Sequence, residues 1–372
     1  MRFVLNARNP ESPAALVCIT GLAEQLERLG HVAVVNDWGN WTNYDVAIVM
    51  SGDSDLREIR KENPGIKIGL ADPKPGSMRQ TEEADFCLVS SIEQREAFLP
   101  WNRNQFIHYM IPKFNSYPVE HREKELYRIF YHGNKIHLNG SYGGLVPALN
   151  ELGKKYRIEF NAIYNVRELG RWSMGRPDPT VCPTRDLQWY PDCYHEYLAN
   201  ADIGVVQNII PWGNERLVRR LGLVSRRMLL ESPMDHMVKF KSSANAGRAF
   251  VFGCFEIPVV ADAVPSMCDA IIDGYSGRLV MTPEGWHDAL EELILSPDRR
   301  RTYGRNFAQA IADRFAPAVS AKRLLQFIEA LVPRARLKLL RDPPSVVAHD
   351  IREEWLRIVR RAERFRNSKK HD

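Results

Sequence analysis

Residues 239–280 alternate between a polar loop, short apolar segments and turns, in an order typical of an α/β unit. Residues 239–248 are rich in lysine, serine and small side chains, an apolar helix-like segment covers 249–255, and a short apolar strand follows at 259–261. Small side chains let the backbone approach a ligand closely, and the free N–H groups at a helix start favour an anion. This stretch therefore predicts an α/β unit whose loop is suited to an anion such as a phosphate.

The same alternation of apolar strands and amphipathic helices runs through residues 1–115. Ser12-Pro13 supplies an N-cap and a first-turn proline for one helix, and Ser54 is the expected N-cap of a helix that ends at residue 62. Such alternation predicts a parallel, doubly wound sheet. Residues 116–125 contain Pro118 and a run of charges, break the apolar pattern, and are the expected linker. A second set of alternating segments then runs over 126–332, although residues 166–190 read as irregular.

Composition favours a protein without membrane spans or disulfides. The chain has 372 residues, of which 44% are apolar and 26% charged, as in ordinary globular proteins. Its six cysteines are scattered without a C-x-x-C pair, which favours free thiols in a reducing compartment. We expect no signal peptide, and no apolar run approaches the roughly 20 residues that a membrane span requires. We therefore expect a cytoplasmic protein.

Positive charge is concentrated in residues 333–372. This tail has 12 Lys and Arg against 6 Asp and Glu, while the whole chain carries a net charge of +5. Its apolar residues recur at spacings of three and four, which predicts an amphipathic helix: Ile351, Trp355, Ile358, Ala362 and Phe365. We expect this helix to cross back to the first domain; the alternative is a peripheral contact with the inner face of an anionic membrane. No recognised basic module interleaved with aromatic residues occurs, so we expect no nucleic-acid partner.

Two sequence motifs within 239–280 carry a family resemblance. Residues 256–265 read EIPVVADAVP, and residues 271–280 read IIDGYSGRLV. They resemble the donor-binding half of GT-B glycosyltransferases, particularly the large retaining, nucleotide-sugar-dependent group that is like glycosyltransferase family 4. The resemblance implies two Rossmann-like domains facing a cleft, with residues 1–115 on the acceptor side and 126–332 binding the nucleotide sugar. It also implies transfer of a sugar to a carbohydrate or lipid-linked acceptor, in cell-surface glycan synthesis.

The polar loop at 239–248 supplies hydrogen-bond donors for a departing phosphate. A nucleotide sugar leaves as a diphosphate or monophosphate, so its site must stabilise the negative charge that grows on the leaving oxygens. The resemblance implies that backbone N–H groups, lysine and arginine do this without a bound metal or other cofactor. We predict a catalytic contribution from Lys241 and donor-binding roles for the other polar residues of this loop: Ser242, Ser243, Asn245 and Arg248.

Further donor contacts are expected from two other loops of the second domain. Its first strand ends at Gly133-Asn134-Lys135, and the resemblance implies a glycine-containing loop here that approaches the donor. Asn134 stands where the family commonly has an arginine, and Lys135 can replace its charge. The resemblance also places Trp189 in the loop that grips the nucleobase. The alternatives are a solvated turn lysine and a packed tryptophan.

One departure from the family pattern leaves the reaction open. The family often has two glutamates eight positions apart, the second of which holds the ribose, whereas this chain has Ser243 and Val251 at those positions. Ribose recognition, donor identity and the choice between retention and inversion are therefore open. The alternatives to a transferase are a catalytically degenerate GT-B protein that binds nucleotide or glycan, and a nucleotide-sugar epimerase or phosphorylase of the same fold.

The carboxyl ends of the predicted strands mark the remaining candidates. Ligands of doubly wound sheets bind at these ends, which places Arg8 and Asn9 on the acceptor side. An inverting enzyme needs a base for the acceptor hydroxyl, and the candidates are Asp53, Asp72 and His132. A retaining enzyme requires no protein nucleophile.

Overall fold

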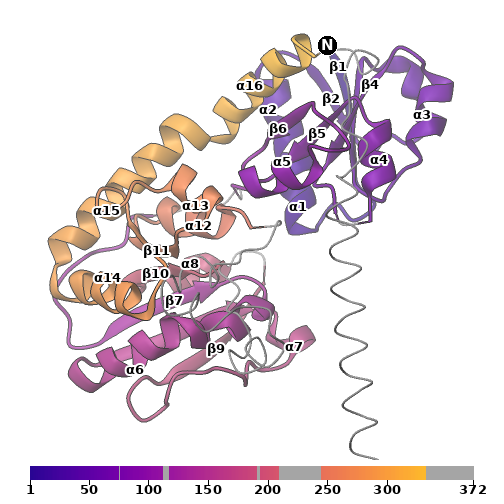
Figure 1. Ribbon diagram of the computed structural model, residues 1–372. Helices are drawn as coiled ribbons and strands as arrows, with labels where there is room; N and C mark the ends of the chain where they lie inside the picture. The colour runs from indigo at the N-terminus through magenta and orange to yellow at the C-terminus, as the bar shows by residue number, and fades with distance from the viewer. Residues whose placement is uncertain (75, 112–116, 191–192, 209–243, 332–372) are drawn as a thin grey trace, which may run out of the picture.

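The computed structural model describes residues 1–74, 76–111, 117–190, 193–208 and 244–331, which form two α/β domains (Figure 1). Each domain contains a six-stranded sheet whose neighbouring strands are all parallel, flanked by helices. The predicted fold class is therefore confirmed. The predicted tail helix lies outside the described residues.

The first sheet has the strand order β2-β1-β3-β4-β5-β6. Its strands are β1 (Arg2–Asn6), β2 (Val32–Val35), β3 (Val46–Met50), β4 (Lys67–Ala71), β5 (Phe86–Val89) and β6 (Gln105–Ile107). The intervening helices are α1 (Pro13–Ala15), the π-helix η1 (Leu16–Gly21), α2 (Leu22–Arg28), the 3-10 helix η2 (Trp41–Asn43), α3 (Leu56–Glu62), α4 (Met78–Glu83) and α5 (Ile92–Phe98).

N-caps were predicted for two helices of the first domain, and the structure shows which residue caps each of them. The Ser12 hydroxyl accepts the N–H of Ala15 at 3.3 Å, so the N-cap predicted for the first helix is confirmed. The prediction of Ser54 as the N-cap of α3 was wrong by one residue. Asp55 occupies that position, and its carboxylate accepts the N–H of Arg57 at 2.9 Å.

The second sheet has the strand order β12-β11-β10-β7-β8-β9. Its strands are β7 (Tyr127–His132), β8 (Ile158–Tyr164), β9 (Thr184–Gln188), β10 (Ile203–Val206), β11 (Val259–Asp262) and β12 (Arg278–Val280). Its helices are the 3-10 helix η3 (Lys135–Gly143), α6 (Leu145–Lys155), α7 (Val166–Leu169), α8 (Cys193–Leu198), α12 (Gly247–Cys254), α13 (Pro265–Ala270), α14 (Pro283–Leu295), α15 (Pro297–Ala310), the π-helix η4 (Ile311–Phe315) and α16 (Pro317–Glu329).

The segment 166–190, predicted to be irregular, contains both a short helix and the edge strand β9. The strand reads TRDLQ and lacks an alternation of apolar side chains. Its Asp186 accepts hydrogen bonds from Arg176 at 2.9 Å and from the Tyr164 hydroxyl at 2.8 Å. With polar pairs of this kind, a strand can join the sheet at its edge without the apolar alternation on which the prediction depended.

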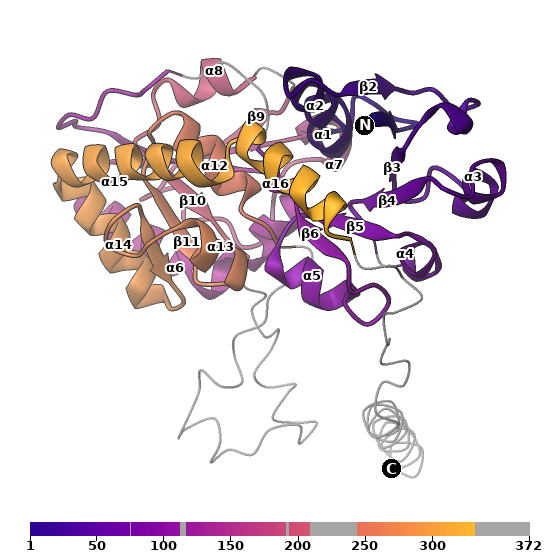
Figure 2. The same cartoon turned by 90° about the horizontal axis from the view of Figure 1, so that it is seen from above.

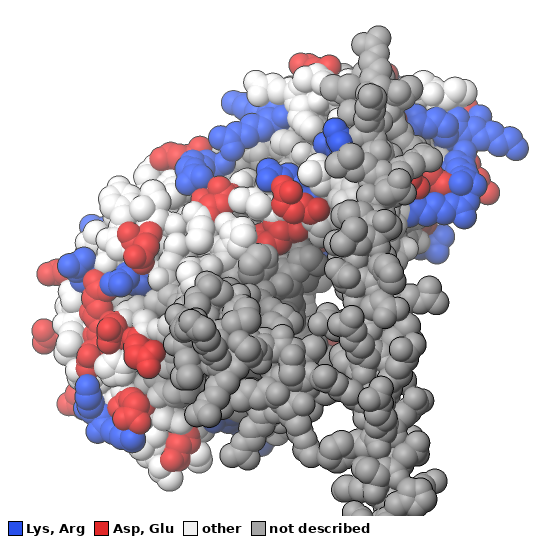
Figure 3. All heavy atoms as spheres, viewed as in Figure 1, with Lys and Arg blue, Asp and Glu red and all other residues white. Residues whose placement is uncertain are grey.

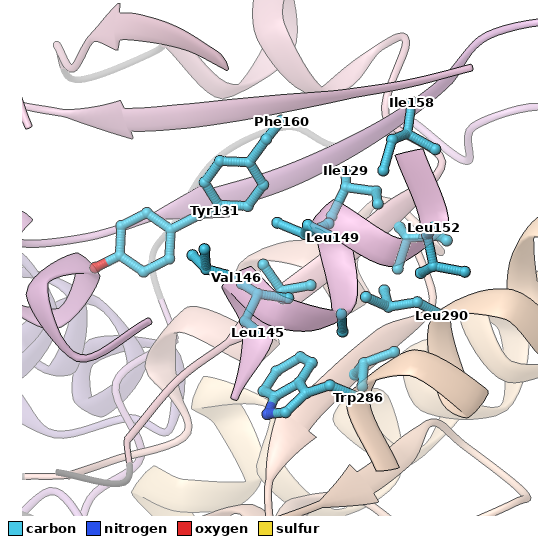
Figure 4. Packing of buried hydrophobic residues seen from close by; sticks show 14 of the residues in the cluster. Ile129, Tyr131, Leu145, Val146, Leu149, Leu152, Ile158, Phe160, Trp286 and Leu290 are labelled. Carbon is cyan, nitrogen blue, oxygen red and sulfur yellow. The ribbon is translucent and has the colours of Figure 1, made fainter. Parts of the chain in front are cut away.

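Helices α6 and α14 cover one face of the second sheet (Figure 4). Leu145, Leu149 and Leu152 recur at helical spacing on α6, and all three side chains are buried. Trp286 and Leu290 of α14 pack into the same cluster. Each such side chain contributes about 1.5–3 kcal/mol to the free energy of folding when it is fully buried. The packed layer therefore holds the sheet, and with it the carboxyl ends of the strands, in a fixed position.

Helix α16 crosses from the second domain to the first (Figure 2). Ala321, Leu324 and Ile328 are buried in the core of the first domain, beside helix α2. Phe327 packs edge-on against Phe86, with ring centroids 5.9 Å apart. A crossing of this kind was predicted for residues 333–372, which lie outside the described residues; in the structure α16 already makes it.

The described surface carries mixed charges. Figure 3 shows Lys and Arg side chains intermingled with Asp and Glu side chains over the second domain, at lower left. Among the described helices, none is both long and apolar enough to cross a bilayer.

Candidate functional site

The carboxyl ends of β7 and β10 and the start of α12 meet around Arg248. One guanidinium nitrogen of Arg248, Nη2, donates to the carbonyl of Gln207 at 2.7 Å and also to the Oδ1 atom of Asn208. The guanidinium lies over the ring of Tyr131, 5.8 Å from its centroid. Gln207 and Asn208 directly follow β10, so the strand end and the helix start are joined by this one side chain.

Three buried N–H groups of this cluster have no acceptor among the described residues. They are Nη1 of Arg248, Nε2 of Gln207 and Nδ2 of Asn208. The amide orientations are fixed by their other oxygen contacts, because Ser141 donates to Oε1 of Gln207 at 2.6 Å and Arg248 donates to Oδ1 of Asn208. Gln207 and Asn208 are only 5% and 4% exposed. Buried donors without acceptors cost stability, and these three are satisfied by any group that supplies acceptor oxygens.

The sequence predicted Arg248 here but missed Gln207 and Asn208. The rule that ligands bind at the carboxyl ends of parallel strands marks both residues, since they directly follow the short apolar run at 203–206. Asn208 is further held by its own N–H, which donates to Oδ2 of Asp262 at 2.7 Å, at the end of the neighbouring strand β11.

The predicted Gly133 loop lies against Arg248. Gly133 has a φ of +130°, and a Cβ atom there would lie 2.8 Å from Cδ of Arg248, so only glycine fits without moving the arginine. The Tyr131 hydroxyl donates to the carbonyl of Asn134 at 2.8 Å. Lys135 turns away from this cluster, and its ammonium donates to the carbonyl of Gly170 at 3.1 Å, just after α7.

His132 is buried beneath the same cluster. Its Nε2 donates to the carbonyl of Arg248 at 2.8 Å, and its Nδ1 lies 3.3 Å from the hydroxyl of Tyr194. Burial lowers the pKa of His132 to about 4. A neutral imidazole whose two nitrogens are both engaged supports the start of α12. The role of His132 as the catalytic base stays a prediction.

The buried His132 predicts a specific pH dependence of stability. The unfolded chain binds a proton below pH 6.5 that the folded chain takes up only near pH 4, so the free energy of unfolding falls as the pH drops through this window. The expected slope is about 1.4 kcal/mol per pH unit for this proton. The free energy of unfolding, measured with urea at several pH values between about 5 and 6.5, should change less per pH unit for His132→Gln than for the wild type. Equal changes per pH unit in the two proteins would contradict a buried, neutral His132.

The other residues predicted to bind the donor lie in the second-domain core, at the start of α12, or outside the described residues. Trp189 is partly buried in the second-domain core, and its indole N–H donates to the Tyr194 hydroxyl at 3.2 Å. Asn245 accepts the N–H of Gly247 at 2.9 Å, where α12 begins. Val251 is 3% exposed and packs inside the same core. Predicted residues Lys241, Ser242 and Ser243 lie outside the described residues.

On the first sheet, the predicted residues Arg8 and Asp53 lie together. The N–H of Arg8 donates to Oδ2 of Asp53 at 2.7 Å, which joins the loops after β1 and β3. The carbonyl of Asn9 accepts the N–H of Ser12 at 3.2 Å and so leads directly into helix α1. Arg8 and Asp53 are 45 residues apart in the chain, and their loops share one edge of the sheet because the strands before them are parallel.

Asp72 is the most constrained of the predicted acidic residues. It directly follows β4 with a φ of +49°, a conformation that costs about 1–3 kcal/mol for a residue other than glycine. Its carboxylate pairs with the ammonium of Lys74 at 2.6 Å and accepts the amide N–H of Gln94 at 3.2 Å. The N–H of Ser90 fixes that amide by donating to Oε1 of Gln94 at 2.6 Å. A strained backbone of this kind is characteristic of functional sites. Gln94, which holds the carboxylate of Asp72, was not among the predicted site residues.

Solved structures share this two-domain arrangement. A glycosyltransferase from Rickettsia africae matches with a TM-score of 0.56 at 11% identity, over 91% of this chain and 99% of that chain. The chain has the GT-B fold. Sucrose-phosphate synthase from Thermosynechococcus elongatus matches with a TM-score of 0.53 at 13% identity, over 89% of this chain and 99% of that one. Anabaena HepE in complex with UDP and glucose gives 0.50 at 10% identity, over 89% of this GT-B chain and 100% of that chain.

The likeness to these solved structures is one of fold. No family model matches this GT-B chain, and no curated protein matches it. At identities between 10% and 13%, these structures establish the fold. The side chains of the described residues that can support chemistry lie in the clusters around Arg248 and Asp72.

Proposed function

We propose that this protein is a glycosyltransferase that moves a sugar from a nucleotide-sugar donor to a carbohydrate or lipid-linked acceptor. The observation that carries the proposal is the group of buried N–H donors without acceptors at Arg248, Gln207 and Asn208. Phosphate oxygens accept hydrogen bonds and never donate them when ionised, so a diphosphate satisfies all three donors at once.

The same group suits the chemistry of the donor. As the glycosidic bond breaks, negative charge grows on the leaving phosphate, and fixed N–H donors in a buried site stabilise that charge without reorganising. Arg248 contributes a full positive charge, and Gln207 and Asn208 contribute oriented dipoles. Lys241, Ser242 and Ser243 precede α12 in the sequence and are proposed to add further donors. No metal or other cofactor enters this proposal.

The acceptor is proposed to bind against the loops after β1, β3 and β4. If the reaction inverts, Asp72 or Asp53 removes the proton of the attacking hydroxyl. Asp72 is held by Gln94 and Lys74, and Asp53 is held by Arg8, so both carboxylates have defined positions.

Several finer points belong to the same proposal. The motifs at 256–280 support membership of the retaining, family 4-like group. A role in cell-surface glycan synthesis in the cytoplasm, with the basic tail at 333–372 touching the inner face of the membrane, fits a lipid-linked acceptor. The bound UDP and glucose of HepE support a nucleotide-sugar donor.

A thermal-shift panel tests the proposed donor. We expect one nucleotide among UDP, GDP, CMP, ADP and dTDP to raise the melting temperature, because a ligand that binds only the folded chain stabilises it by mass action, by about 2.7 kcal/mol at 100 times its Kd. The corresponding nucleotide sugar should then be consumed when acceptors are supplied. A flat panel would contradict the proposed function, and binding without consumption would point to a degenerate binder.

A further inference from the structure

A buried carboxylate of the first domain is bound by the second domain. Glu93 lies on α5 and is 5% exposed. Its Oε1 atom accepts the N–H of Ser266 at 2.9 Å and the hydroxyl of the same residue at 2.8 Å. Ser266 lies on α13 and is also buried, and Figure 1 and Figure 2 show α5 and α13 side by side. The contact therefore joins the two domains in a place that is largely closed to water.

The two partners of this contact depend on each other for their hydrogen bonds. Helix α13 begins after Val264, whose side chain cannot cap it, so the N–H of Ser266 has no acceptor within its own helix. A buried carboxylate is costly without donors, and both donors that reach Glu93 among the described residues belong to Ser266. A shift of α5 away from α13 would leave polar groups unpaired on both sides. The contact therefore fixes the position of one helix relative to the other.

On the first-domain side, Glu93 lies next to the residue that holds Asp72. Gln94 is the following residue in the first turn of α5, and its amide donates to the carboxylate of Asp72 at 3.2 Å and to the carbonyl of Pro73 at 2.8 Å. The same helix turn therefore contacts both the second domain and the loop after β4.

On the second-domain side, the contact lies close in the chain to the Arg248 cluster. Ser266 follows Asp262 by four residues, and the carboxylate of Asp262 accepts the N–H of Asn208 at 2.7 Å. Asn208 in turn accepts a hydrogen bond from Arg248. The start of α13 is thus joined to the proposed donor site through the end of β11.

We propose that Glu93 is a positioning residue, which holds Asp72 at a fixed position relative to the Arg248 cluster. The inference rests on the proposed glycosyl transfer, in which Asp72 takes the proton of the acceptor while Arg248 stabilises the departing phosphate. The two groups lie in different domains and must be in place together, because a misplacement of about 1 Å can lower a rate by about 100-fold. Glu93 acts through α5 and α13 and not by contact with either substrate.

Glu93→Ala tests this role with the nucleotide sugar that the thermal-shift panel identifies. We expect kcat to fall about tenfold, while the Kd of the nucleotide stays unchanged, because the Arg248 cluster lies wholly within the second domain. Glu93→Gln keeps an oxygen that accepts from Ser266 and should retain most of kcat. The matched control is Glu96→Ala, which removes an exposed carboxylate from the same helix and should leave kcat unchanged. Equal kcat values for Glu93→Ala and the wild type would overturn the proposal.

An Asp72→Asn background distinguishes positioning from a general loss of structure. If Glu93 acts through Asp72, adding Glu93→Ala to this background should lower kcat no further. A second tenfold fall would overturn the action through Asp72. Should Glu93→Ala not fold, Ser266→Ala removes one of the two donors from the other side of the contact, and its smaller loss of kcat should likewise disappear in the Asp72→Asn background.

Hydrogen exchange of the Ser266 N–H, followed by NMR, tests the contact without any measurement of activity. This N–H should be protected in the wild type, in Glu93→Gln and in Glu96→Ala, and should exchange rapidly in Glu93→Ala. Rapid exchange in the wild type would overturn the contact and the proposal with it. A wild type that consumes no nucleotide sugar would instead contradict the proposed function, and the exchange rates would still decide whether Glu93 joins the two domains.

Discussion

Replacing Arg248 with methionine is expected to lower kcat/KM for the nucleotide sugar by about 100-fold, or about 2.7 kcal/mol. The guanidinium is the one charged group in the cluster of buried donors, and its Nη1 atom has no acceptor among the described residues. Methionine retains the length of the side chain and can still pack on the Tyr131 ring. The loss should therefore fall on binding and turnover, measured with the nucleotide that the thermal-shift panel identifies.

The control for this experiment is Arg305→Met, which removes an arginine from an exposed position on α15. Both variants should keep the circular dichroism spectrum of the wild type. The Arg248 variant also leaves Oδ1 of Asn208 without its donor, so a loss of about 1–3 kcal/mol in stability is expected and should be measured separately. A folded Arg248→Met protein with unchanged kinetics would remove the arginine from the proposed mechanism.

Most of the fold could be predicted from local patterns, because its buried strands are short apolar runs between clear helix signals. β3 and β5 are buried on both faces and stand out in the sequence as short apolar runs. β9 could not be found in this way, since Asp186 pairs with Arg176 and replaces apolar burial. The shift of the N-cap from Ser54 to Asp55 is an ordinary failure of boundary prediction, since both residue types cap helices well.

The candidate site was predicted less completely than the fold. Arg248 and Gly133 stand out in the sequence as a cation near a helix start and a glycine after a strand, and the structure brings them into contact. Gln207 is marked only by its place directly after a strand. Gln94 has no signal of this kind, because its amide becomes informative only when it is seen to be buried and fixed by neighbours. The pairing of Arg8 with Asp53 depends on strand order, which the sequence does not state.

Replacing Asp72 with asparagine is expected to lower kcat by 10²- to 10⁴-fold, with little change in KM for the donor, if this carboxylate is the base for the acceptor hydroxyl. Asparagine tolerates a positive φ and retains an oxygen for the amide of Gln94, so the local backbone should persist. The ion pair with Lys74 is lost, but that lysine is 59% exposed, and its pairing should add little stability.

The matched variant Asp53→Asn decides between the two first-domain carboxylates. Asp53 lies at the end of β3 and holds the N–H of Arg8, so its replacement perturbs a neighbouring loop while Asp72 remains in place. If only Asp72→Asn loses turnover, Asp72 is the base; if only Asp53→Asn does, the assignment moves one strand along the sheet. Turnover that survives both changes would exclude a carboxylate base from these two loops. That result would favour a retaining reaction, in which the departing phosphate, held by Arg248, itself takes the proton of the acceptor.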